Sequence, residues 1–310
     1  MTSANILPFL RSGYRGYLLA ICLLILVATQ SLPAQSAAPQ PPPTVVFMTD
    51  FGVVDDSVAL CKGVMYGIVP NLRIVDLTHQ VTAFSIADGA RFLFGASPYF
   101  PAGTVFVGVV DPTVGSARKA IVVKSKRGQF FVVPDNGLIT MVADRDGVES
   151  SREITNPDWM IGAKVSSTFH GRDIFSPVGA HLARGDDWTQ LGPELKQLVR
   201  LDLRPATLDE RGLTGEVIAL DGPFGNLVTN ISAEDFLKLG YQRGDLLKVT
   251  IGDHEIQMPF VKTFADVPLK QPLLYIDSRG RAGIALNQSS LAAMYKIQPP
   301  QPIFIPRKGH

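Results

Sequence analysis

Two aspartates follow predicted strands of the chain, at places where an α/β fold presents a ligand site. Asp50 ends the apolar run from Thr44 to Asp50, and Asp111 ends the run from Thr104 to Asp111. Ligands of open parallel sheets bind beyond the carboxyl ends of the strands, so the two carboxylates could share one site. Aspartate after a strand also serves as a turn or helix-cap residue, and spacing alone leaves both interpretations open.

A second polar group is Phe169-His170-Gly171-Arg172-Asp173. Histidine exchanges protons near neutral pH, although a single histidine is more often a packed or surface residue, and Arg172 with Asp173 could be a surface ion pair. His79 and His181 have no partners at metal-ligand spacing, so we expect no metal site. No GxGxxG follows the first strand and no GxxxxGK[ST] occurs, which argues against a phosphate-binding loop.

Two further polar segments, 221–226 (DGPFGN) and 277–280 (DSRG), lie in the second half of the chain. Each has the composition of a plain turn. Taken residue by residue, the sequence indicates an α/β enzyme without naming its substrate.

The elements that would position these residues alternate between β-branched runs and helical stretches. Strands are predicted at 44–50, 72–78 and 104–111, and further strands at 121–123 and 130–133. Asp55 and Asp56 are predicted to cap a helix through Ile68, and Ser85 to open a helix that contains Ile86, Ala90 and Leu93. Another helix is predicted around 177–184. Helical crossovers between the first three strands predict a mostly parallel sheet in an α/β sandwich.

The pattern changes after Pro205. Short strand-like runs separated by Gly, Asp and Pro turns predict a smaller, antiparallel β-barrel domain; they lie at 215–220, 246–251, 255–261, 273–276 and 303–305. We therefore predict an N-terminal α/β domain at 44–205 and a C-terminal β-barrel domain at 206–310.

Composition limits the class of protein. The chain has 310 residues, of which 46% are hydrophobic and 18% charged, so it can bury a core. Its formal net charge is only +1, which gives no reason to expect nucleic acid as a partner. The two cysteines, Cys22 and Cys61, are too few for a disulfide scaffold or a cysteine-based zinc site.

The first forty residues have the layout of a secretory signal peptide. Arg11 and Arg15 precede the apolar run from Tyr17 to Ala28, and small residues and prolines follow. The run is short for a transmembrane span. We expect an exported protein, periplasmic or secreted, with an uncleaved N-terminal membrane anchor as the alternative.

Seven segments in order resemble the S-adenosylmethionine (SAM) hydroxide adenosyltransferases, or SAM hydrolases, and their sister family of SAM-dependent fluorinases and chlorinases. The likeness runs from about Val45 to Phe304. It is carried by FMTDFGVVDDSVALCKGVMYGIVP, VDLTHQV, YFPAGTVFVGVVDPTVGSAR, VVPDNGL, TFHGRDIFSPVGAHLA, DGPFGNLVTNI and DSRG. The resemblance implies an α/β domain followed by a β-barrel, with SAM as the substrate and no cofactor.

The resemblance also implies a catalytic trio. Hydroxide-transferring members carry Asp and Arg in a DPGVGTxR motif and His in FHGRD, which correspond to Asp111, Arg118 and His170. In this chain Thr113 replaces the glycine of the first motif and Ser116 replaces its threonine. Threonine resists backbone conformations that glycine adopts freely. By this match, the function is hydrolysis of SAM to adenosine and L-methionine by an activated water or hydroxide that attacks ribose C5′.

Two alternatives remain open. Halogenating members have other residues at the trio positions and usually a long insertion, for which the chain has no room between Arg118 and Gln129. The stretch from Phe47 to Tyr66 nevertheless resembles that branch, so the first alternative is a chlorinase-like halide adenosyltransferase. The second is an exported nucleoside-binding protein without catalysis, because SAM is an intracellular metabolite.

The remaining implied residues bind the substrate. Asp50 would accept hydrogen bonds from the ribose diol, and Phe84 stands where halogenating relatives keep a tryptophan against the ligand. The second domain would supply Asn226 and Phe264 for adenine, and Asp221, Ser278, Arg279 and Asn287 for methionine. Family members form their pocket between the N-terminal domain of one subunit and the C-terminal domain of its neighbour, which implies a homotrimer.

Overall fold

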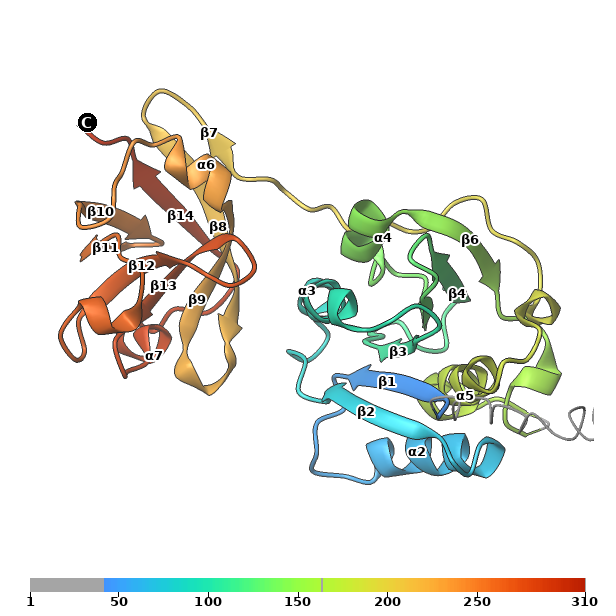
Figure 1. Ribbon diagram of the computed structural model, residues 1–310. Helices are drawn as coiled ribbons and strands as arrows, with labels where there is room; N and C mark the ends of the chain where they lie inside the picture. Colours follow the sequence, from blue (N-terminus) through green and yellow to red (C-terminus); the bar gives the residue numbers. More distant parts are fainter. Residues whose placement is uncertain (1–41, 163, 310) are drawn as a thin grey trace, which may run out of the picture. The chain divides into compact units, whose positions relative to one another are not determined.

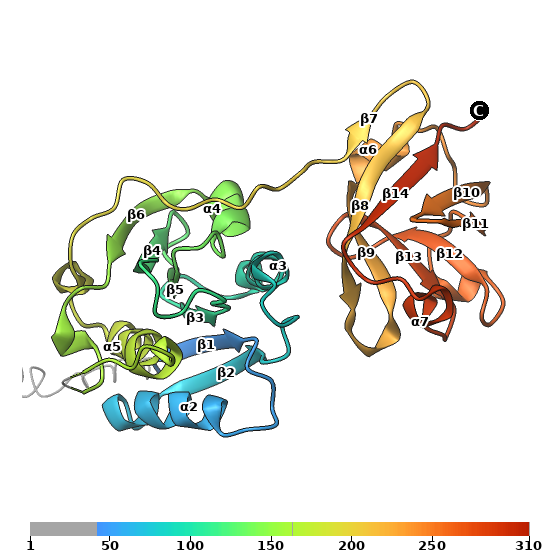
Figure 2. The ribbon, with the colours of Figure 1, turned by 180° about the vertical axis from the view of Figure 1, so that it is seen from behind.

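The computed structural model describes residues 42–162 and 164–309, and Figures 1 and 2 show the elements from two opposite sides. The expected signal peptide and the alternative membrane anchor, at 1–40, lie outside the described residues. Within those residues, no helix combines the length and the apolar content that a membrane crossing requires.

The N-terminal part contains a mostly parallel sheet of six strands in the order β2-β1-β3-β5-β4-β6. β1 runs parallel to β2 and β3, and β3 runs parallel to β5, whereas β4 is antiparallel to both β5 and β6. The strands are β1 (Thr44–Thr49), β2 (Arg73–Thr78), β3 (Val105–Val109), β4 (Ala120–Ser125), β5 (Phe130–Pro134) and β6 (Val148–Glu153).

Two hydrophobic cores lie on opposite faces of this sheet because successive strand side chains point to opposite sides. From β1, Val45 and Phe47 join the core that includes residues of α2 (Ser57–Ile68) and α5 (Ser176–Arg184). Val46 and Met48 join the core that includes residues of α3 (Ile86–Ala96) and α4 (Thr140–Asp146). The sheet is therefore the middle layer of an α/β sandwich.

The starts of two helices test the predicted caps. Ser85 caps α3 as predicted, since its hydroxyl accepts the Asp88 amide at 3.2 Å. For α2 the prediction is wrong at Asp56, whose side chain makes no capping bond because its backbone is already helical rather than extended. Asp55 instead accepts the Ser57 amide, at 3.0 Å.

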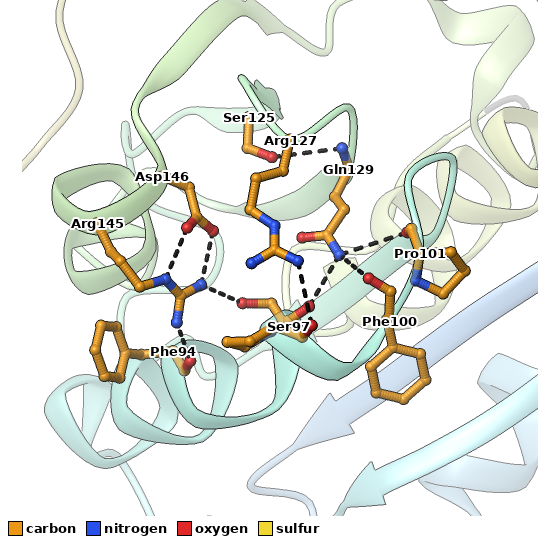
Figure 3. A network of polar contacts seen from close by, with 10 residues as sticks. Phe94, Ser97, Phe100, Pro101, Ser125, Arg127, Gln129, Arg145 and Asp146 are labelled. Atoms are coloured by element: carbon orange, nitrogen blue, oxygen red, sulfur yellow. Dashed lines mark hydrogen bonds and ion pairs between the residues drawn. The ribbon is translucent and has the colours of Figure 1, made fainter. Parts of the chain in front are cut away.

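A polar network holds the C-terminal end of α3 (Figure 3). The buried Gln129 amide donates to the carbonyl oxygens of Ser97 and Phe100, at 2.9 and 2.7 Å. Arg145, from α4, donates to the Ser97 hydroxyl at 2.8 Å and to the Phe94 carbonyl. These bonds satisfy carbonyl groups that a helix end leaves without partners, and they fix α3 on the sheet.

The C-terminal part is an antiparallel sheet in the order β11-β10-β14-β8-β9-β13-β12, with β7 paired to β8. A bridge between Phe260, just after β11, and Leu274 in β12 joins its two edges, so the sheet is nearly a closed barrel. The strands are β7 (Thr207–Leu208), β8 (Gly212–Asp221), β9 (Asn226–Ser232), β10 (Leu246–Ile251), β11 (His254–Pro259), β12 (Pro272–Ile276), β13 (Arg281–Leu286) and β14 (Gln301–Pro306).

Two short helices, α6 (Ala233–Leu237) and α7 (Leu291–Tyr295), accompany the barrel, and its core includes Phe236 and Leu291 from them. The predicted fold class, an α/β sandwich with a mostly parallel sheet followed by an antiparallel barrel, is confirmed. The domain boundary between 205 and 206 stays a prediction.

Candidate active site

A cavity of about 240 Å³ lies beyond the carboxyl ends of β1 and β3. Asp50 directly follows β1, and Asp111 follows β3 by one further residue. A third segment, which immediately precedes the π-helical turn η3 (Gly171–Phe175), completes the wall. Among the lining residues are Asp50, Phe51, Phe84, Asp111, Phe169 and His170. The prediction that Asp50 and Asp111 reach one site agrees with this geometry.

Arg118 joins the other two members of the predicted trio. Its Nε donates to both carboxylate oxygens of Asp111 at 2.9 Å, and its Nη2 donates to Asp111 Oδ2. The same Nη2 lies 2.9 Å from Nδ1 of His170. The side chains of Arg118 and Asp111 are only 8% and 4% exposed, so bulk water screens their attraction little.

This contact fixes the proton on His170. A guanidinium has no acceptor atom, so Nδ1 of His170 must accept and the neutral ring carries its hydrogen on Nε2. Burial lowers the pKa of His170 below its usual 6.5, and the Arg118 charge lowers it further, while Asp111 and Asp173 oppose the shift. The imidazole is therefore held neutral, with an N–H available to the cavity that it lines.

A close approach of two loops brings the trio together. Gly115 has φ +79°, and a Cβ added there would lie 2.2 Å from the carbonyl oxygen of Ser167. Only glycine allows this contact between the loop that carries Asp111 and the loop that carries His170.

Asp173 anchors the second loop. Its buried carboxylate accepts the Ser166 amide at 2.7 Å and pairs with Arg172 at 2.6 Å. The ion pair is therefore not a plain surface pair, because the Asp173 side chain is buried at 3% exposed, whereas that of Arg172 is 36% exposed.

Thr113 does not prevent the loop that carries Asp111 from forming, and its hydroxyl lies 3.4 Å from Asp111 Oδ1.

Phe84 reaches the cavity on a strained backbone. Its φ is +65°, rare for an aromatic residue, and its amide donates to Asp50 Oδ2 at 2.9 Å. Asp88 holds the preceding segment by accepting both the amide and the hydroxyl of Thr82, and it pairs with the buried Arg91. Phe84 is 72% exposed, so its ring offers an apolar surface to a ligand.

The predicted residues of the C-terminal part fall into two groups. Asp221, Asn226, Phe264 and Asn287 line a separate cavity of about 1120 Å³. Ser278 and Arg279 are exposed and do not appear in its lining; they sit in a turn in which Asp277 accepts the Arg279 amide at 2.8 Å.

Sequence reasoning missed two aromatic walls of the smaller cavity. Phe51 and Phe169 pack edge to face, with ring centroids 5.8 Å apart. Their position beside Asp50 and His170 in the sequence was the available signal. Within residues 42–162 and 164–309, no three His, Cys, Asp or Glu residues gather as a metal site would require.

The sheet is mostly parallel and covered by helices, and its carboxyl edge carries a buried carboxylate and guanidinium beside a half-buried imidazole. This is the architecture of an α/β enzyme. Comparison with known families shows to which family of α/β enzymes the chain is similar. The chain matches the SAM hydroxide adenosyltransferase N-terminal domain over residues 45–192 and the C-terminal domain over residues 215–304. The protein belongs to the SAM hydroxide adenosyltransferase family, which confirms the resemblance seen in the sequence.

Relatives of both branches are similar to the chain. An (R)-S-adenosyl-L-methionine hydrolase from Salinispora tropica is 39% identical, with 84% of this chain and 96% of the relative covered. A fluorinase from Actinoplanes sp. (strain N902-109) is 34% identical, with 83% and 95% covered. A crystal structure of an uncharacterized conserved protein from Thermotoga maritima has a TM-score of 0.80 and 39% identity, and covers 84% and 99% of the two chains.

Proposed function

We propose that the protein hydrolyses S-adenosyl-L-methionine to adenosine and L-methionine by attack of water or hydroxide on ribose C5′. The observation that carries this proposal is the direct contact of Arg118 with both Asp111 and His170 at one cavity. The similarity to relatives named (R)-S-adenosyl-L-methionine hydrolase supports it.

The reaction needs a placed oxygen more than it needs an acid. An oxygen lone pair forms the O–C5′ bond while the electron pair of the C5′–S bond leaves with sulfur as neutral methionine. No proton has to be given to the leaving group, and the positive sulfonium is already activated, so no cofactor is required. The task of the site is to hold an oxygen in line with the breaking bond.

The trio divides this task. Nε2–H of the neutral His170 donates to the nucleophilic oxygen and orients it. The Arg118 charge favours hydroxide character in that oxygen. Asp111 is the member of the trio that still has lone pairs to accept the released proton. A weak base suffices, because an oxygen that has bonded to carbon while it keeps both hydrogens is a very strong acid.

The other predicted ligands complete the proposal. Asp50 would bind the ribose diol through its carboxylate, and Phe84 would pack against the ligand. In the C-terminal part, Asn226 and Phe264 would contact adenine, and the methionine would be bound by Asp221, Ser278, Arg279 and Asn287. We further propose a homotrimer whose sites combine the N-terminal part of one subunit with the C-terminal part of the next.

The assembly and the location have separate tests. Size-exclusion chromatography with light scattering should give three times the subunit mass. A monomer with full activity would contradict active sites that are shared between subunits. We propose export through the predicted signal peptide with cleavage between Ala34 and Ala38, so the N-terminal sequence of protein from the cell envelope should begin within residues 35–38. An unprocessed N-terminus would instead favour an anchor.

The second candidate function is transfer of a halide, which the similarity to fluorinases motivates. Incubation with SAM and excess chloride or fluoride distinguishes the two reactions. Hydrolysis yields adenosine at a rate independent of halide, whereas a halogenase yields 5′-halo-5′-deoxyadenosine. Binding of adenosine with no turnover of SAM would instead support the nucleoside-binding alternative.

A further inference from the structure

A chain of hydrogen bonds outside the trio leads from the protein surface into the loop after β1. Lys62 donates to Asp76 Oδ2 at 2.6 Å, and Oδ1 of Asp76 lies 3.1 Å from His79 Nε2. On the other side of the ring, His79 Nδ1 lies 2.9 Å from Thr49 Oγ1. Thr49 Oγ1 in turn accepts the backbone amide of Phe51 at 3.2 Å.

The order of donors along this chain is consistent from end to end. The Asp76 carboxylate, which also pairs with Lys62, only accepts, so His79 Nε2 donates to it. Nδ1 of the neutral ring is then the acceptor for the hydrogen of Thr49 Oγ1, and Thr49 Oγ1 itself accepts the Phe51 amide. Thr49 is fully buried and His79 is 7% exposed, so water does not compete for the bond between them.

His79 holds the same loop a second time through its backbone. Its carbonyl oxygen accepts the amide of Gly52 at 2.7 Å. Its ring also packs edge to face on Phe47 of β1, with centroids 4.9 Å apart. The bonds to Thr49 and Gly52 bracket Asp50 in the sequence, so His79 fixes the backbone on both sides of that carboxylate.

We propose that His79 is a positioning residue that sets the place of Asp50 for the ribose diol. It acts through Thr49 and the backbone of residues 51 and 52, and it touches neither the ligand nor the reacting atoms. The inference rests on the proposed function, in which Asp50 accepts hydrogen bonds from the diol. Loss of the ring nitrogens should weaken recognition of the ribose hydroxyls more than it slows the chemical step.

Two substitutions separate the hydrogen bonds from the packing. His79→Phe keeps an aromatic ring against Phe47 and removes both nitrogen partners. His79→Asn retains a polar atom near the position of Nδ1 and should restore the bond to Thr49. The matched control is His181→Phe, because His181 also pairs with a carboxylate, Asp186 at 2.7 Å, and packs on an aromatic ring, but its side-chain hydrogen bonds go to Asp186 and Arg184 and not to the loop after β1.

The measurements use the full chain. Calorimetry gives the dissociation constants of adenosine and 2′,3′-dideoxyadenosine. The dissociation constant of the dideoxy compound divided by that of adenosine, called the affinity ratio below, reports recognition of the diol. Two hydroxyls bonded to a carboxylate should make the ratio about tenfold or more in the parent. Amide hydrogen exchange at residues 51 and 52 reports the order of the loop without any ligand.

For His79→Phe we expect the ratio to fall to about threefold or less, a raised KM for SAM with a smaller change in kcat, and faster exchange at residues 51 and 52. His79→Asn should recover much of the ratio, and His181→Phe should match the parent. A parent-like affinity ratio or unchanged amide exchange in His79→Phe would overturn the positioning role of His79 and leave the proposed function intact. A parent that binds both nucleosides equally would overturn the diol role of Asp50 and, with it, the inference.

Discussion

Replacement of Arg118 by methionine should damage both stability and activity, for separable reasons. Arg118→Met keeps an unbranched side chain beside the Phe175 ring, which the guanidinium carbon approaches at 5.2 Å. It removes the donors to Asp111 and His170. Asp111, 4% exposed, is then left as a buried charge without its partner.

The size of the effect follows from that burial. Removal of one partner from a buried ion pair costs about 3–5 kcal/mol of unfolding free energy. Loss of a donor that organises the reacting oxygen lowers kcat by about 10²–10³. The double variant Arg118→Met with Asp111→Asn removes the unpaired charge, so it should regain much of the stability while it stays inactive.

Tryptophan fluorescence during urea unfolding measures the stability of the N-terminal part selectively, because both tryptophans, Trp159 and Trp188, lie there. Adenosine release from SAM measures activity. Arg184→Met is the control, since Arg184 pairs with Asp186 at the surface and its loss should cost less than about 1 kcal/mol. The reasoning fails if Arg118→Met is as stable as the control or keeps the parent's kcat.

Three further predictions follow from the site and its supports. Because burial and the Arg118 charge lower the pKa of His170, activity should persist from neutral pH down to about 6.5 and fall only below it. Below pH 6.5 the unfolded chain binds a proton that the folded chain does not, so the free energy of unfolding should also decline as the pH falls. This decline should be smaller in His170→Phe. A half-loss of kcat above pH 6.5 would be inconsistent with this. Gly115→Ala should cost clearly more unfolding free energy and activity than Gly103→Ala, because both glycines have positive φ but only the first Cβ would meet a carbonyl oxygen; equal effects would contradict the loop contact. Burial raises the pKa of Cys61 to about 11, so peptide mapping after iodoacetamide treatment should find this thiol unmodified in the folded protein and modified in urea, whereas rapid labelling without urea would disprove its burial.

Local patterns predict the parts of the fold that are apolar and periodic. The buried run of β1 and the Ser85 cap of α3 are visible in the sequence because each depends on neighbours in the chain. The elements that escaped prediction are β6, β7, β9, β13, α4, α6 and α7. β6 reads VESSRE, with little apolar alternation, and it becomes a strand because β4 offers it a hydrogen-bonding edge.

The candidate site also has a part that the sequence alone predicts and a part that it does not. Residue types and strand ends predicted that Asp50 and Asp111 could share a cavity, but the match to a family was needed to add Arg118 and His170. Their contact spans 52 positions in the sequence. It depends on the approach of Gly115 to Ser167, which no local pattern reveals. The part played by His79 was equally hidden, because its two ring partners lie three and thirty positions away.

The central claim is that this protein transfers an oxygen from water to the ribose carbon that sulfur leaves. Incubation of the purified protein with SAM in heavy-oxygen water, followed by mass spectrometry, tests it most directly. We predict adenosine with one heavy oxygen at the 5′ position and methionine without any. Unlabelled adenosine, a 5′-halogenated nucleoside or intact SAM would contradict the claim.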